Sequence, residues 1–158
     1  MKISTRGRYA LRMMIELAKK QGDGYVSLTE IAESQNISKK YLEQIIPLLS
    51  HASFLTTTRG FRGGYRLSKS PSEYCVGDIL RVTEGSISPV SCADVDNPCE
   101  CEKCGVCKTY PLWRKLTQII TDYLDSVTLD DLVKGRIELD SVEDVRPEER
   151  RSEDGRQI

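Results

Sequence analysis

Residues 27–67 constrain the fold of this chain most, because they place two short helices, a tight turn and a glycine-rich hairpin in direct succession. Ser27 and Glu30 match the capping-box pattern that begins a helix, and Ser38 stands at the cap position of a second helix. Residues 35–37 between the two helices are expected to form a tight turn. This order of elements predicts a helix-turn-helix.

The second helix has two chemically different faces. Its apolar residues recur at the spacing of a buried helical stripe, which consists of Leu42, Ile45, Ile46 and Leu49. Its polar face consists of Lys39, Lys40, Glu43 and Gln44. Pro47 lies inside this helix and cannot donate a hydrogen bond to the carbonyl of Glu43, so we expect a kink or an early loosening there.

A β-hairpin is expected directly after this helix. The segments Phe54–Arg59 and Tyr65–Leu67 have the composition of strands, and the glycine-rich residues 60–64 between them form the expected tip. Arginines at 59, 62 and 66 lie on or beside this tip. A hairpin in this position is the wing of a winged helix-turn-helix.

Helical periodicity also predicts helices over residues 5–20, 76–83, 112–127 and 129–133. The apolar face of residues 112–127 covers a wide arc, which needs more cover than one small domain supplies. The expected fold class is therefore mostly α with a small β-hairpin wing, followed by a long C-terminal helix.

Charge is distributed unevenly along the chain. Residues 1–70 contain twelve Lys and Arg against five Asp and Glu, a net charge of +7, whereas residues 71–158 contain eleven against nineteen, a net charge of −8. A basic N-terminal half favours contact with a polyanion, although a solvated surface can show the same asymmetry without a partner. Together with the helix-turn-helix and the wing, the charge favours binding to double-stranded DNA.

The candidate DNA contacts follow from how a recognition helix lies in the major groove. Glu43 can accept from cytosine N4, Gln44 can pair with adenine, and residues 39–41 suit phosphates. An arginine such as Arg59 can enter a narrow minor groove. The predicted DNA-binding residues are Arg8, Ser38, Lys39, Lys40, Tyr41, Glu43, Gln44, Arg59, Arg62, Gly63, Gly64 and Tyr65. A helical hairpin without a DNA role would share the helices, but not the wing and the basic half-chain.

Four stretches carry a family resemblance: ISTRGRYAL near the start, SKKYLEQ at 38–44, RGFRGGYRL at 59–67 and LWRKL at 112–116. They resemble the Rrf-two (Rrf2) family of bacterial winged-helix transcriptional regulators, whose branches include the IscR, NsrR and CymR types. The resemblance runs from Met1 to about Lys134 and implies a homodimer, a promoter-binding role and a long C-terminal helix that crosses to the partner subunit. Two recognition helices about 34–36 Å apart, or a multiple of that, would face a pseudo-palindromic site.

Four segments are expected. Residues 1–85 form a winged helix-turn-helix DNA-binding domain, and residues 86–107 form a cysteine-rich metal or cluster loop. Residues 108–135 form a dimerisation helix and a short final helix, and residues 136–158 form a charged tail that we expect to be disordered.

Five of the six cysteines lie between Cys92 and Cys107, in a segment without helical periodicity. The chain has no stretch apolar enough to span a membrane and no signal-peptide pattern, so we expect a cytoplasmic location, where thiols stay reduced. The cysteine spacing fits an iron–sulfur cluster, a structural zinc ion and a reactive thiol pair. The sixth cysteine, Cys75, precedes a helix and is expected to be a small apolar core residue.

The family resemblance implies iron. IscR and NsrR types hold a cluster with three loop cysteines, which correspond here to Cys92, Cys101 and Cys107. IscR types place a histidine ligand three residues after the last cysteine, and this chain has Tyr110 at that position. The fourth ligand is therefore expected to be Cys104, which completes a ferredoxin-like spacing, or else Cys99.

NsrR types can supply an acidic ligand from near residue 8 of the partner subunit. This chain has Arg8 at that position, so we expect no ligand from it. The cofactor favoured by the resemblance is a 2Fe–2S cluster, with 4Fe–4S as the alternative and zinc as the second metal.

Three functions remain open on the sequence. The first is a homodimeric regulator, acting as a repressor, that senses through an iron–sulfur cluster and controls iron–sulfur, sulfur or redox-stress genes. The second is the same DNA-binding regulator with a structural zinc ion or a thiol redox switch. The third is a redox carrier without DNA binding, which would have no use for a wing. The sequence has no Rossmann glycine motif and no plausible general base near the cysteine loop, so nothing supports a substrate pocket. We therefore expect that the chain is not an enzyme.

Overall fold

The structure is a computed structural model that describes residues 2–22, 24–60, 63–94, 101, 103 and 105–138. The helices are α1 (Thr5–Lys19), α2 (Leu28–Gln35), α3 (Lys39–His51), α4 (Val76–Glu84), α5 (Tyr110–Ser126) and α6 (Leu129–Lys134). The strands are β1 (Leu55–Thr58) and β2 (Gly64–Leu67), and two short 3-10 turns are η1 (Pro71–Glu73) and η2 (Ser91–Ala93). This arrangement confirms the expected fold class, mostly α with one hairpin.

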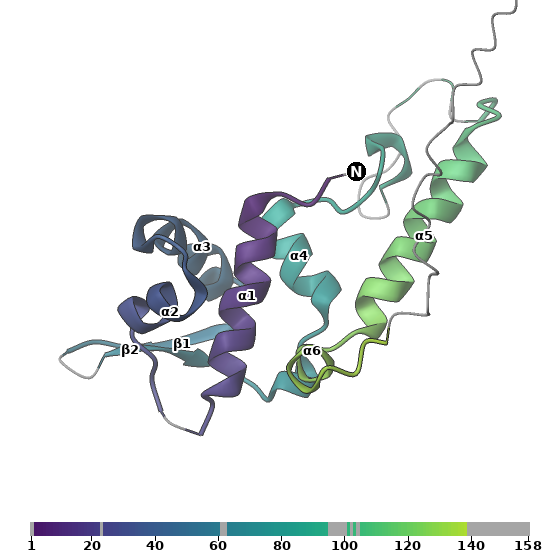
Figure 1. The fold of residues 1–158 in the computed structure, drawn as a ribbon. Coiled ribbons are helices and arrows are strands. Elements are labelled where there is room, and N and C mark those ends of the chain that lie inside the picture. The colour runs from purple at the N-terminus through teal and green to yellow at the C-terminus, as the bar shows by residue number, and fades with distance from the viewer. Residues whose placement is uncertain are drawn as a thin grey trace, which may run out of the picture.

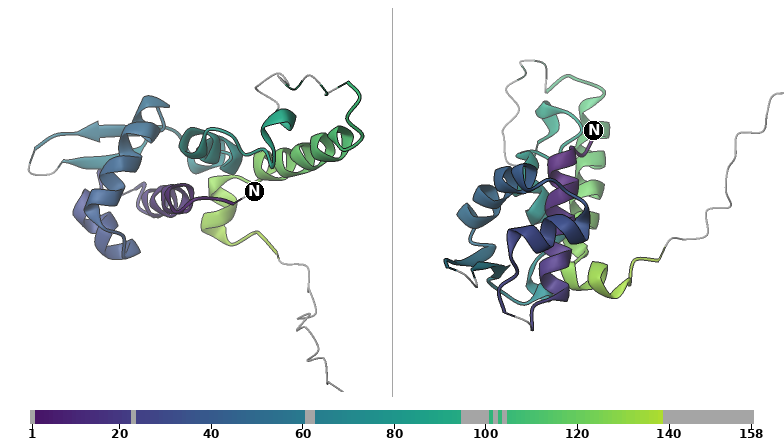
Figure 2. Two further views of the ribbon diagram at one scale, coloured as in Figure 1. Left: turned by 90° about the horizontal axis from the view of Figure 1, so that it is seen from above. Right: turned by 60° about the vertical axis from the view of Figure 1, so that its left-hand side comes forward.

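The elements form a head, which consists of α1 to α4 and the hairpin, and an extension, which is α5. α2, α3 and the hairpin lie on one side of α1, and α4 lies on its other side (Figure 1). The hairpin and α5 occupy opposite ends of the molecule, with α1 and α4 between them (Figure 2). No helix within the described ranges has both the length and the apolar character needed to cross a lipid bilayer.

The main core lies where α1 meets α2, α3 and α4. Met13 and Met14 of α1 are fully buried. They belong to one apolar cluster with Ile31, Leu42, Ile45, Leu49, Ile79 and Leu129, so residues from both ends of the chain complete it. A second, smaller cluster joins α4 to the chain just after α5, through Val76, Leu80, Ile87 and Val127.

The expected helix starts are confirmed. Ser4 caps α1, Ser27 caps α2 and Ser38 caps α3, in each case by accepting a backbone N–H with the side-chain oxygen. The turn between α2 and α3 contains Asn36 in the left-handed conformation, at φ 51°, which asparagine tolerates better than most residues.

Three local expectations need correction. Glu30 does not return to Ser27 to complete a capping box, because its carboxylate accepts from Lys20 at 2.5 Å. α3 continues past Pro47 to His51, so the helix does not loosen early there, and the kink stays a prediction. Cys75 is not a core residue, because it stands at the cap position of α4 with its thiol directed at Asp125 (3.8 Å).

The start of α1 is joined to the end of α4. The carboxylate of Glu84 accepts from the Ser4 hydroxyl at 2.6 Å and from the Gly7 N–H at 3.0 Å. A Cβ atom at Gly7 would lie 2.3 Å from the same carboxylate oxygen, so the approach requires glycine. A negative charge at this helix start is also favoured by the helix dipole.

The chain after α5 returns to the head. Val76 donates to the Val127 carbonyl and Leu129 donates to the Tyr74 carbonyl, both at 2.9 Å. These bonds form an antiparallel bridge that pairs Cys75 with Thr128. This bridge therefore fixes the C-terminal end of α5 to the start of α4.

Candidate nucleic-acid interface and cysteine loop

The face of α3 that points away from the core is polar. Leu42, Ile45, Ile46 and Leu49 are buried against the head. The opposite side chains are all exposed, and they are those of Lys39, Lys40, Glu43 and Gln44. A helix with buried apolar residues on one face and exposed cationic, acidic and amide groups on the other can contact both phosphates and base edges.

Aromatic and polar contacts from α1 hold the start of α3. The ring of Tyr41 meets the ring of Tyr9 edge-on, with 5.1 Å between the centroids. The Arg12 guanidinium lies 5.6 Å from the Tyr9 ring and donates to the side chain of Gln35 at 3.2 Å and to its carbonyl. Tyr41, which the sequence assigned to phosphates, is therefore half-buried, and its ring also positions the helix.

A buried carboxylate extends this network. Glu16 accepts from the Gln35 amide at 2.8 Å and pairs with Lys20 at 3.2 Å. Burial raises its pKa, but hydrogen bonds from Ser34, Lys20 and Gln35 outweigh that effect and leave the pKa below its ordinary value. Glu16 is thus held ionised between α1 and α2. No motif in the sequence predicted this network, and the one available signal was the placement of a charged residue, Glu16, on the inner side of α1.

The hairpin is a tight antiparallel ladder that pairs Leu55 with Leu67 and Thr58 with Gly64. Tyr65 exchanges two backbone hydrogen bonds with Val26, both at 2.9 Å, so the strand after the tip has a partner on each side. A Cβ atom at Gly64 would lie 2.3 Å from the Val26 carbonyl oxygen. Gly64 is therefore buried in the second strand, which gives a packing reason for glycine there beside the expected contact with DNA.

Gly63 and Arg59 lie at the described edges of the tip. Gly63 donates to the Gly60 carbonyl at 2.9 Å, and a Cβ atom at Gly63 would lie 2.7 Å from the Thr58 carbonyl oxygen. Arg59 is exposed. Arg62 lies outside the described residues. Arg8 is exposed on α1, where it donates to the Thr5 hydroxyl at 3.1 Å.

Tyr74 holds the base of the wing to the head. Its hydroxyl donates to the Phe54 carbonyl at 3.0 Å and accepts from the Lys69 N–H at 2.9 Å. Its ring packs edge-on against Phe54, with 5.4 Å between the centroids, and the residue is buried. The wing is therefore anchored at both of its ends to one buried tyrosine.

Three of the five loop cysteines fall on described residues. Cys92 is half-buried in η2, Cys101 is exposed, and Cys107 is half-buried three residues before α5 begins. Cys99 and Cys104, the two candidates for a fourth ligand, lie outside the described residues. The three described thiols are free, and those of Cys101 and Cys107 lie outside helices and strands, which suits ligands that must converge on a metal.

The environment of Cys107 favours its thiolate. Its sulfur lies 3.2 Å from the Thr109 hydroxyl, and hydrogen bonds from that hydroxyl, from the Thr109 backbone and from the Tyr110 N–H lower its pKa. A thiolate is the form that binds iron or zinc. The chemistry of these sulfur donors therefore fits either metal.

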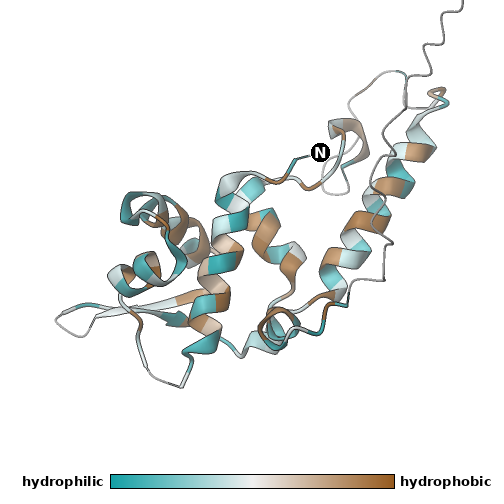
Figure 3. Ribbon diagram, viewed as in Figure 1, coloured by the Kyte–Doolittle hydropathy of each residue, from teal (hydrophilic) through white to brown (hydrophobic). Residues whose placement is uncertain are grey.

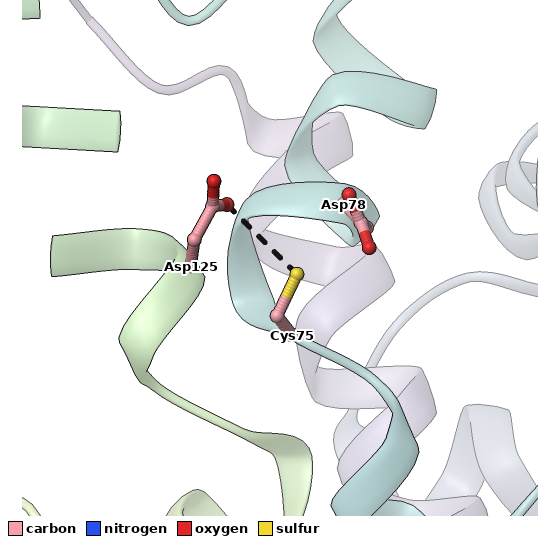
Figure 4. Close-up of side chains that lie close together, drawn as sticks. All are labelled: Cys75, Asp78 and Asp125. Atoms are coloured by element: carbon pink, nitrogen blue, oxygen red, sulfur yellow. Dashed lines mark hydrogen bonds between the residues drawn. The ribbon is translucent and has the colours of Figure 1, made fainter. Parts of the chain in front are cut away.

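A second group of possible ligand atoms lies away from the predicted set. The thiol of Cys75 and the carboxylates of Asp78 and Asp125 have ligand atoms within 4.8 Å of one another (Figure 4). Arg81 already neutralises both acids, with 2.7 Å to Asp78 and 2.6 Å to each carboxylate oxygen of Asp125. Burial, followed by the nearby acids, raises the pKa of the Cys75 thiol and disfavours its thiolate. This group is therefore an ion-pair cluster, and we assign no metal to it.

One face of α5 is apolar and uncovered. Leu112, Ile119 and Tyr123 are 59%, 54% and 57% exposed, and Leu116, on the same stripe, is 37% exposed. Apolar bands recur along α5 (Figure 3). An exposed apolar stripe of this length is typical of an interface.

Comparison with known proteins identifies related regulators. The model of the Rrf2 family, described as an iron-dependent transcriptional regulator, matches residues 3–135. The HTH-type transcriptional regulator CymR of Bacillus subtilis is 45% identical over 132 residues, which cover 84% of this chain and 89% of that protein. The HTH-type transcriptional regulator IscR of Pectobacterium carotovorum is 35% identical over 156 residues, which cover 99% of this chain and 93% of that protein.

A solved structure also matches. The structure of CymR (YrzC), described as the global cysteine regulator of B. subtilis, superimposes with a TM-score of 0.71 at 43% identity. The match covers 85% of this chain and 98% of that one. The related proteins are regulators of transcription and not enzymes.

Proposed function

The chain belongs to the Rrf2 family of transcriptional regulators, and from this premise we propose that it is a homodimeric repressor that binds a pseudo-palindromic promoter site and senses through its cysteine loop. The observation that carries the DNA-binding part is the exposed polar face of α3 opposite its fully buried stripe. Its membership of a regulator family excludes the redox carrier as the preferred function.

In the proposed complex, α3 lies in the major groove. Glu43 and Gln44 read base edges, whereas Lys39, Lys40 and the Ser38 end of the helix contact phosphates. The wing follows the sugar–phosphate backbone through Gly63, Gly64 and Tyr65, and Arg59 and Arg62 approach the minor groove. Arg8 adds a phosphate contact from α1. We propose that the protein acts in the cytoplasm, where a bacterial regulator of transcription binds DNA.

The partner for the apolar stripe of α5 is a second copy of the chain. Leu112, Leu116, Ile119 and Tyr123 recur at the three- and four-residue spacing of a helix–helix seam. A two-fold axis along this seam would present two α3 helices to one face of the DNA. Half-sites one helical turn apart, or a multiple of it, would then match the protein.

We infer that Cys92, Cys101 and Cys107 hold an iron–sulfur cluster, with Cys104 or Cys99 as the fourth ligand. The support is the free thiols of the three described cysteines, the lowered pKa of Cys107 and the description of the family as iron-dependent. A bound 2Fe–2S or 4Fe–4S cluster would supply a redox-sensitive centre. The loop runs directly into α5, so a change in its packing is transmitted to the dimer helix.

A zinc ion or a thiol redox switch in the same loop is the second candidate. The observation that favours it is the similarity to CymR, which is described as the global cysteine regulator of B. subtilis. Under either candidate, the regulated genes are those of iron–sulfur, sulfur or redox-stress metabolism.

One experiment tests the proposal. The full-length protein is purified without oxygen, its absorption spectrum and its iron, sulfide and zinc contents are measured, and binding sites are selected from random duplex DNA. A brown protein with bound iron and sulfide that selects an inverted repeat supports the proposal. A colourless, zinc-loaded protein that selects the same repeat supports the second candidate, and failure to select any site in both loaded and metal-free forms contradicts DNA binding.

A further inference from the structure

We propose that Gln35, the last residue of α2, is a positioning residue that sets the base specificity of α3 without contacting DNA. The inference rests on the proposed DNA binding and deepens it. Gln35 is half-buried, and both polar groups of its side chain are bound to α1. Its side-chain oxygen accepts from Arg12 Nε at 3.2 Å, and its side-chain NH2 group donates to Glu16 at 2.8 Å. These bonds direct the side chain at α1 and away from the role of a base-reading group.

An amide is the side chain that fits between these two partners. Arg12 offers only donors, and Glu16, when ionised, offers only acceptors. A single group between them must accept on one side and donate on the other, as the glutamine amide does. Glu16 is only 6% exposed, so loss of the donor would leave a buried carboxylate with fewer hydrogen bonds. A carboxylate in place of the amide would face a second carboxylate.

The same arginine holds the turn that leads into α3. Arg12 also donates to the backbone carbonyl of Gln35, in the way that cationic side chains satisfy carbonyls at the C-terminal end of a helix. Two residues separate this carbonyl from Ser38, which caps α3. One of the two, Ile37, is buried, so the connection has little freedom to turn independently. The position of Gln35 therefore determines where α3 begins relative to α1.

A second contact with α3 starts from the same guanidinium. It lies 5.6 Å from the ring of Tyr9, which in turn meets the ring of Tyr41 edge-on. Tyr41 belongs to the first turn of α3. Arg12 thus joins both the turn before α3 and the first turn within it to one place on α1 (Figure 1). Loss of the side-chain bonds of Gln35 would loosen this joint and let α3 shift against α1.

A shift of α3 has unequal effects on its two kinds of DNA contact. Base reading by Glu43 and Gln44 needs hydrogen bonds of fixed length and direction. Phosphate contacts by Lys39 and Lys40 come from long, flexible side chains that can follow a displaced helix. Loss of the Gln35 bonds should therefore lower the affinity for the selected site much more than the affinity for random DNA.

The experiment measures the specificity ratio of the full-length protein, which is the Kd for random DNA divided by the Kd for the selected site at one salt concentration. Gln35→Met nearly keeps the size of the side chain but removes both of its hydrogen bonds. It should lower the ratio about tenfold, as expected for partial loss of base reading. A merely structural role would reduce the active fraction of the protein, which stoichiometric titration measures, and would leave the ratio unchanged.

Gln21→Met is the matched control. Gln21 is an exposed glutamine that follows α1 and donates to the Lys69 carbonyl at 3.0 Å. This substitution also removes a hydrogen bond between distant segments, but one that does not involve Arg12 or the turn before α3. Its specificity ratio should equal that of the parent protein.

An exchange of the two side chains tests the assigned pairing. Gln35→Glu alone sets two carboxylates against each other and should lower the ratio. Addition of Glu16→Gln restores one donor and one acceptor and keeps an acceptor for Arg12, so the ratio should return to the parent value. Circular dichroism identifies the variants that remain folded. A parent-like ratio in either folded single variant at Gln35, or no recovery in the exchanged pair, would overturn the inference. A parent protein that selects no site would instead contradict the proposed function.

Discussion

One nitrogen of the Arg81 guanidinium in α4 donates to both carboxylate oxygens of Asp125 in α5, each at 2.6 Å. This pair joins the DNA-binding head to the helix that carries the apolar stripe. Gly77 allows the contact, because a Cβ atom there would lie 1.9 Å from an Asp125 oxygen. Movement of α5 relative to the head must therefore stretch or break this ion pair.

We expect a measurable coupling between these two side chains. In a double-mutant cycle of Arg81→Gln and Asp125→Asn, urea unfolding should give a coupling free energy of about 0.5–1 kcal/mol, since both groups are partly exposed to water. Asp78→Asn in the same cycle tests the share of the second acid. A coupling of zero would mean that the pair does not join the two helices energetically.

Gln44→Ala should relax the preference for one base pair and cost about 1–3 kcal/mol of binding free energy on the selected site. The loss on random DNA should be small, because the side chain is expected to read a base edge. Lys40→Ala is the matched control on the same exposed face, and it should weaken binding to all sequences and reduce the salt dependence. Equal losses on specific and random DNA for Gln44→Ala would argue against base reading.

Ile119→Glu should convert the dimer to a monomer, because it places a charge in the middle of the apolar stripe. Light scattering after gel filtration measures the mass, and affinity for a full inverted repeat should fall much more than affinity for a half-site. Gln118→Lys introduces a charge beside the stripe, where it can pair with Asp122, and should leave the dimer intact. A dimeric Ile119→Glu variant would show that the interface lies elsewhere.

Cys107→Ala should bleach the absorption of the anaerobically purified protein and lower its iron and sulfide contents. Cys75→Ala is the control, because that thiol lies beside Asp125 at the start of α4 and outside the loop. It should retain the full spectrum. Full colour in the Cys107→Ala variant would show that the ligands are other residues.

The acid stability of the α6 cap should depend on Asp131. Hydrogen bonds from the Thr128 hydroxyl and N–H, together with Arg136, lower the pKa of Asp131 from 3.8 to about 2. A lowered pKa means that the stabilisation is fully present above pH 3.8 and is lost as the pH falls through about 2. The difference in the free energy of unfolding between the parent protein and Asp131→Asn should therefore be largest at neutral pH. It should disappear in strong acid.

Carboxyl NMR titration measures this pKa directly. Thr128→Ala removes the largest cause of the shift and should move the pKa of Asp131 back toward its ordinary value. An ordinary pKa for Asp131 in the parent protein would contradict the capping interaction.

Local sequence signals predicted the elements of this fold well. Serines at 4, 27 and 38 each begin a helix because a side-chain hydroxyl satisfies a backbone N–H within three residues, which is information contained in the sequence itself. The exposed polar face of α3 was also predictable, because helical periodicity is contained in the local sequence. Membership of the family, which the four quoted stretches indicated, is confirmed by the match over residues 3–135.

Contacts between distant segments could not be predicted. Glu84 meets Ser4, and Asp125 meets Arg81, across 80 and 44 residues of sequence. Such pairs depend on how helices pack, which no local pattern encodes. Cys75 was misassigned for this reason, since cysteine is usually buried and only the return of the chain at Thr128 brings an acid next to it. The DNA contacts and the metal ligands stay predictions.

Leu129 is completely buried in the same cluster as Met13 and Met14, although more than a hundred residues separate them in sequence. During synthesis, the first 85 residues leave the ribosome before α6, which supplies Leu129 to this cluster. The head therefore reaches its final packing after the cysteine loop and α5 have been made. Completion of this core and completion of α5 with its apolar stripe therefore fall within the same short stretch of synthesis, because α5 ends at Ser126 and α6 begins at Leu129.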